Sequence, residues 1–222
     1  MKLFWKRNAP LELPDVEAQD GIETQPPYSD MLRRLQRIFL SPGPPGAMGT
    51  DSQWHEDWDN FIDRKYEDDF VHEFSSEWIE PFLYLYTHPS VLIEATMDEE
   101  WEGEVGRLLG RVARRFPAPM LPSICLMLHT VETRLIAICA LDSYGEPDAL
   151  PYLKSLADQT GQMREEEIVA FIEAIESVIY RTTDDAVKRE AENLLRHLGR
   201  VIPSDFAEAF QRLGIYATQR ET

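Results

Sequence analysis

From Pro89 towards the end of the chain, apolar residues recur at the three- and four-residue spacing of an amphipathic helix, in segments of helix length. Brief turns that contain Pro, Gly, Asp or Thr separate these segments. The sequence lacks sustained alternation of apolar and polar positions and Val/Ile-rich runs joined by Asn-Gly or Asp-Gly turns, so strands are not expected. The pattern predicts an all-α fold, with helices near 90–97, 101–116, 119–129, 131–144, 148–158, 165–180, 184–198 and 204–213.

Between Asp51 and Pro81, aromatic and aliphatic residues recur mostly at spacings of three, four or eight, with carboxylates between them. This pattern favours one or two amphipathic helices. In one interpretation these helices cap the end of a helical stack and bury Trp54, Trp58 and Trp78; in the other they form an exposed surface for a partner. Capping is favoured, because a terminal apolar face needs a cover and tryptophans at helical spacing usually lie in a core.

Residues 1–50 are rich in proline and have no long periodic apolar pattern, which indicates a mostly irregular arm. Within it, a short basic amphipathic helix is expected at 31–40, with Ser29-Asp30 as its N-terminal cap. Closely spaced Pro and Gly then make 41–50 a linker. The basic helix suits three roles: binding in a groove of a partner, contact with an anionic membrane surface, or folding back on the acidic segment that follows.

The net charge of −18 and the pI near 4.6 argue against nucleic acid as a ligand, because such binding depends on clustered Lys and Arg. The negative charge is concentrated in residues 41–100, which hold fifteen acidic and two basic side chains. Such a surface accelerates association with a basic protein. We therefore take Asp57, Asp68 and Asp69 as candidate partner-binding residues.

The N-terminal residues Leu3-Phe4-Trp5, flanked by Lys2, Lys6 and Arg7, form a second candidate contact. Phe4 and Trp5 would anchor it, either to a protein groove or, through residues 1–7, to a membrane surface; the alternative is a disordered terminus. No apolar run reaches the length of a membrane span or of a signal peptide core, so a cytoplasmic location is expected. The two cysteines lie in apolar helical segments and suit a reducing compartment.

Two consecutive segments share a pattern of prolines and alanines at helical spacing. Pro122 recurs as Pro151 after 29 residues, and Ala140 recurs as Ala174 after 34 residues, which indicates stacked helical hairpins. Residues 118–180 resemble HEAT-type repeats, especially the short bacterial kind in phycobilisome-lyase-like proteins. The residues that carry the resemblance are Ala149-Leu150-Pro151-Tyr152-Leu153, which match the first helix, and Arg134, Ala137, Ala140, Leu141 and Gly145, which match the second.

The resemblance implies a curved α-solenoid that binds another protein along one face. Some relatives are enzymes or chromophore chaperones, which leaves a lyase-like or metal-dependent function as the alternative. Fold analogy gives no residue a role. We expect an arm over 1–50 and a helical domain over 51–222, composed of acidic aromatic capping helices at 51–88 and HEAT-like repeats at 89–215.

Catalytic and metal-binding patterns are weak. His55-Glu56 and His72-Glu73 resemble the iron-binding dyads of deoxyhypusine hydroxylases, but they are only two and lie outside the repeats. Cys125 and His129 would share a helix face, yet their apolar neighbours predict a buried, unreactive thiol. The sequence therefore predicts a non-enzymatic scaffold, adaptor or accessory subunit, without cofactor or metal, that binds another protein.

Overall fold

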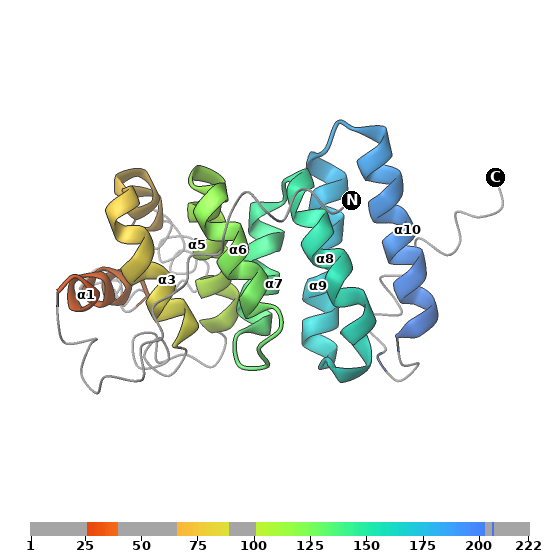
Figure 1. Cartoon of the computed structure of the whole chain (residues 1–222), viewed down its shortest axis with the longest axis horizontal. Helices are drawn as coiled ribbons and strands as arrows, with labels where there is room; N and C mark the ends of the chain where they lie inside the picture. Colours follow the sequence, from red (N-terminus) through yellow and green to blue (C-terminus); the bar gives the residue numbers. More distant parts are fainter. Residues whose placement is uncertain (1–25, 40–65, 89–100, 203–205, 207–222) are drawn as a thin grey trace, which may run out of the picture. The chain divides into compact units, whose positions relative to one another are not determined.

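The computed structural model describes residues 26–39, 66–88, 101–202 and 206, and in these ranges the regular structure is entirely helical, as predicted (Figure 1). The chain divides into two compact units, Met1–Trp101 and Glu102–Thr222. Among the described helices, none is long and apolar enough to cross a membrane. The expected helix at 90–97 and nearly all of that at 204–213 fall outside the described residues.

The first unit contains α1 (Tyr28–Phe39), a helix over 66–73, the 3-10 turn η2 (Ser76–Trp78) and α3 (Ile79–Thr87). Helix α1 packs against α3 and buries one apolar stripe, Met31, Leu35 and Ile38. This is the periodic face that the sequence predicts. The helix begins earlier than the expected 31–40, because the amide of Met31 already bonds to the carbonyl of Pro27 at 3.1 Å, so Ser29 and Asp30 lie in its first turn.

An aromatic cluster forms the core of the first unit. Phe74 packs edge-on against Phe82 with ring centroids 5.1 Å apart, and Phe82 lies 4.6 Å from Tyr86. Phe70 contacts Phe74 at 5.5 Å and stacks on Trp78 at 6.2 Å. Trp78, which the sequence assigned to a core, is half-buried at the edge of this cluster. Trp54 and Trp58 are outside the described residues.

The second unit consists of consecutive helices joined by short turns. In order, they are α5 (Trp101–Arg115), α6 (Pro117–Met127), α7 (Arg134–Tyr144), η3 (Pro147–Ala149), α8 (Leu150–Leu156), η4 (Ala157–Gln162), α9 (Glu165–Arg181) and α10 (Asp185–Val201). Helices α5, α6, α7 and α9 match the expected segments within three residues, whereas the segment expected as one helix at 148–158 divides into η3, α8 and η4. Pro147 and Pro151 lie in the first turns of η3 and α8, where their missing amide hydrogens cost nothing.

Helices α5 and α7 run parallel and approach closely. A Cβ added to Gly106 would lie 2.6 Å from the Cβ of Cys139, and one added to Gly110 would lie 2.7 Å from the Cβ of Ser143. Farther along α5, the Nε of Arg114 donates to the carbonyl of Tyr144 at 3.0 Å. Because the contacts advance in the same direction along both helices, the two helices are parallel.

Helices α7 and α9 repeat this arrangement. The contacts pair Arg134 with Glu167 near the start of both helices and Asp142 with Ser177 farther along. At the end of α7, the Nη1 of Arg181 donates to the carbonyl of Tyr144 at 3.2 Å. Helices α5, α7 and α9 therefore lie parallel in sequence order, and the intervening α6 and α8 return the chain between them (Figure 1).

Candidate functional site

The predicted partner-binding residues divide between described and undescribed parts of the chain. Asp68 and Asp69 are exposed on the helix over 66–73, while Phe70 on the same helix is buried in the aromatic cluster. The two carboxylates thus lie on the outer side of a helix that is anchored by its inner side. Phe4, Trp5 and Asp57 lie outside the described residues, so their role stays a prediction.

The basic helix α1 folds back on this acidic unit. The guanidinium of Arg34 lies 4.0 Å from the centroid of the Trp78 ring and 3.9 Å from a carboxylate oxygen of Glu73. At the start of the helix, the hydroxyl of Tyr28 donates to Glu80 at 3.1 Å. Of the three roles considered for this helix, the structure shows the intramolecular one. Its arginines compensate part of the negative charge of the unit.

The residues described in 66–88 and 101–202 contain no group of three or more His, Cys, Asp or Glu side chains placed to hold a metal ion. His72 and Glu73 are exposed, and Glu73 contacts Arg34 instead. His55-Glu56 lies outside the described residues.

The two cysteines are free and half-buried. Burial raises the pKa of the Cys125 thiol, and the exposed His129 contacts Gln159, with 2.9 Å between the His129 Nδ1 and the Gln159 Nε2. Burial, together with the charges of Asp142, Glu173 and Glu102, raises the pKa of Cys139 to about 12. A thiol with a raised pKa is a poor nucleophile at neutral pH, which agrees with a structural role.

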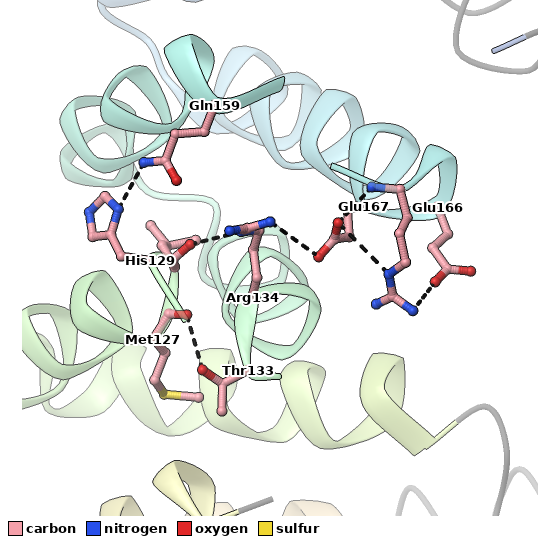
Figure 2. A network of polar contacts seen from close by, with 9 residues as sticks. Met127, His129, Thr133, Arg134, Gln159, Glu166 and Glu167 are labelled. Atoms are coloured by element: carbon pink, nitrogen blue, oxygen red, sulfur yellow. Dashed lines mark hydrogen bonds and ion pairs between the residues drawn. The ribbon is translucent and has the colours of Figure 1, made fainter. Parts of the chain in front are cut away.

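A buried ion pair connects the start of α7 to the start of α9 (Figure 2). Arg134 is 3% exposed and Glu167 is 1% exposed, and the Nη1 of Arg134 lies 3.9 Å from the Oε1 of Glu167. The Nε of Arg134 donates to the carbonyl of Leu128 at 3.1 Å. The Oε2 of Glu167 accepts the backbone amide of Arg164 at 2.7 Å, which caps the N-terminus of α9.

The two facing atoms of this pair, the Arg134 Nη1 and the Glu167 Oε1, have no hydrogen-bond partner among the described residues. A buried ion pair at this distance gains less than a direct bond. Removing Glu167 leaves the charge of Arg134 buried and uncompensated, whereas removing Arg134 leaves Glu167 with the more exposed Arg164, whose Nε lies 3.8 Å away. The pair therefore fixes how α7 and α9 pack rather than adding much net stability. The sequence contains only part of the information that points to this pair. Arg134 belongs to the repeat pattern, and Glu167 follows Arg164 at the spacing of a capping box.

Two arginines from neighbouring helices converge on the C-terminus of α7. Arg114 of α5 and Arg181 of α9 both donate to the carbonyls of Ser143 and Tyr144. Gly145 ends the helix with a φ of 61°, in the left-handed region that favours glycine. Cations at a helix C-terminus compensate its unpaired carbonyls. These polar groups hold helix ends together, and their arrangement is not that of a catalytic site.

Comparisons of the chain with protein-family models, with curated proteins and with solved structures give no match.

Proposed function

We propose that this protein is a non-catalytic scaffold or adaptor that binds another protein, built as a short HEAT-like α-solenoid. The parallel succession of α5, α7 and α9, with α6 and α8 as return helices, supports the solenoid. Arg114, Arg134, Arg181 and Glu167 contact helix ends or one another, so we assign none of them a catalytic role. The two free thiols agree with a reducing, cytoplasmic location.

The observation that carries the binding proposal is the placement of Asp68 and Asp69. Both carboxylates are exposed on a helix whose opposite side is fixed in the aromatic cluster through Phe70. A charged surface on a rigid support presents a fixed geometry to a partner, which lowers the entropic cost of binding. Since the surrounding chain is strongly acidic, we propose a partner with a basic surface.

Affinity purification from native lysate tests this function. The bait is the full chain, either wild type or carrying Asp68→Lys and Asp69→Lys, and Asp185→Lys on the exposed first turn of α10 serves as the control for charge change. We expect the wild type and the control to retain one basic protein at near-stoichiometric yield and the double variant to lose it. Elemental analysis and an absorption spectrum accompany the purification. A stoichiometric metal or chromophore, with no retained protein, would contradict the scaffold and favour the small-molecule alternative.

A further inference from the structure

The turn between α6 and α7 exposes two large apolar side chains. Leu126 in the last turn of α6 is 53% exposed, and Val131 in the connection is 63% exposed. Together with Tyr180 and Val201 they are the large apolar side chains that the described part of the chain leaves exposed, and these two alone share one turn. Exposed apolar groups that share one turn, unlike isolated ones, mark a candidate contact surface.

Hydrogen bonds from buried side chains and from the backbone hold this turn in place. The hydroxyl of the buried Thr133 donates to the carbonyl of Met127 at 3.0 Å, and the buried Arg134 donates to the carbonyl of Leu128 at 3.1 Å. The backbone adds a bond from the amide of His129 to the carbonyl of Leu126 at 3.1 Å. Side chains from inside the unit thus fix the carbonyls that position the two exposed apolar groups.

The next helical pair also supports the turn (Figure 2). The ring of His129 contacts the side chain of Gln159 in η4, and Arg134 faces Glu167 of α9 across 3.9 Å. The turn is therefore tied to α9 and η4 as well as to its own helices. A rigid turn loses little conformational entropy when it binds a partner, so it can act as a preorganised contact.

The charges beside the turn are acidic. Glu132 is exposed next to Val131, and Asp158 is exposed next to Gln159 in η4. Residues 102–222, which make up the second unit, hold nineteen acidic and fourteen basic side chains. A segment that covers Leu126 and Val131 must bring apolar side chains for the contact, and positive flanking charges make its approach favourable.

We propose that the α6–α7 turn, with Leu126 and Val131 at its centre, docks a partner segment that carries apolar side chains flanked by Lys or Arg. This inference deepens the proposed scaffold function and rests on it. The buried Arg134 and Thr133 act as positioning residues for the turn. Glu132 and Asp158 supply the charge that selects a basic segment.

Photocrosslinking tests the location and the partner chemistry together. The photoreactive amino acid benzoylphenylalanine replaces Val131 in one full-length variant and the exposed Tyr180 in a matched control. Thermal melting of both variants verifies that the fold is kept. After irradiation in native lysate, mass spectrometry identifies the crosslinked peptide. We expect the yield from position 131 to exceed that from position 180 at least tenfold. We also expect the crosslinked peptide to hold apolar residues next to Lys or Arg, and Glu132→Lys, unlike Asp185→Lys, to lower the yield several-fold.

Each of the following results would contradict the proposed docking site. An adduct from position 180 with none from 131 overturns it while leaving the scaffold function intact. So does an adduct at 131 with a second copy of this chain, with lipid, or with a peptide that lacks basic residues. Absence of adducts from both positions overturns the docking site alone if affinity purification still retains a protein. If purification retains none, the scaffold function fails with it.

Discussion

At the scale of single residues, two glycines determine how closely α5 approaches α7. Gly106 and Gly110 lie four residues apart, on one side of α5, and both face the backbone of α7. An added Cβ at Gly106 would lie 2.6 Å from the carbonyl oxygen of Ile136, and one at Gly110 would lie 2.9 Å from the amide nitrogen of Tyr144. Backbone atoms cannot rotate away as a side chain can, so only glycine fits at these positions.

We expect Gly110→Ala to lower the free energy of unfolding by about 1–3 kcal/mol, because the overpacking outweighs the better helix propensity of alanine. Gly199→Ala in α10 is the matched control, since an added Cβ there meets nothing within 4 Å. It should raise stability by about 0.5–1 kcal/mol. Urea denaturation measures both. Equal effects of the two substitutions would contradict the close approach of α5 and α7.

The thiol of Cys139 gives a second prediction at this scale. Its pKa of about 12, against an ordinary value of 9.0, leaves about a thousandfold less thiolate at pH 8. In a Cys125→Ser background, iodoacetamide should modify Cys139 that much more slowly than a free thiol. The rate should keep rising as the pH increases from 9 towards 12, because the thiolate is the reacting form. A rate that reaches half its maximum near pH 9 would show an unshifted thiol.

At the scale of secondary-structure elements, the buried pair of Arg134 and Glu167 links α7 to α9. We expect Glu167→Met alone to destabilise the protein by about 3–5 kcal/mol, because it leaves the buried charge of Arg134 without its partner. Arg134→Met alone should cost less, because Glu167 keeps its contact with the Nε of Arg164 at 3.8 Å. The double variant should recover the part of this loss that comes from the unpaired charge, but not the part that comes from the lost cap of α9. The exposed pair of Lys154 and Glu190 provides the control cycle, whose coupling should not exceed about 1 kcal/mol. Additive effects of the two buried substitutions in urea denaturation would mean that the pair does not couple the helices.

Helix α1 is an integral part of the first unit rather than a tail. Leu35 of α1 is fully buried, so Leu35→Ala should lower the free energy of unfolding by about 2–5 kcal/mol. Arg33 is exposed, and among the described residues its side chain contacts Ser29 and Asp30 of its own helix, so Arg33→Ala should change stability by less than about 1 kcal/mol. Thermal melting compares the two. A melting temperature that is unchanged by Leu35→Ala would show that α1 does not pack on the unit.

The same elements show what the sequence could predict. Helical periodicity located α6, α7 and α9 within three residues, because burial of one face produces a pattern that can be read locally. It missed the division of 148–158, where short 3-10 turns differ from α-helix by hydrogen bonds rather than by hydrophobicity. It also missed the contact of Arg134 with Glu167. Those side chains are 33 residues apart in the sequence, and only the packing of α7 on α9 brings them together.

At the scale of the whole molecule, the uneven distribution of charge matters most. Acidic side chains outnumber basic ones by thirteen in residues 41–100, and the sequence alone located this excess. The structure adds that Asp68 and Asp69 are exposed and that arginines of α1 compensate part of the charge of the same unit. Local pattern cannot show such compensation, because contacting residues such as Arg34 and Glu73 lie 39 residues apart in the sequence. The remaining acidic surface is the basis for the proposed attraction of a basic partner.

The most direct test of the scaffold is the rate constant of association with the protein that affinity purification retains, measured by stopped flow from about 0.05 to about 0.5 M salt. For the wild type we expect this rate constant to fall at least about tenfold over that range, because salt screens electrostatic attraction. Asp68→Lys with Asp69→Lys should remove most of this dependence, and Asp185→Lys should preserve it. A wild-type rate constant that is independent of salt and equal to that of the double variant would contradict the account.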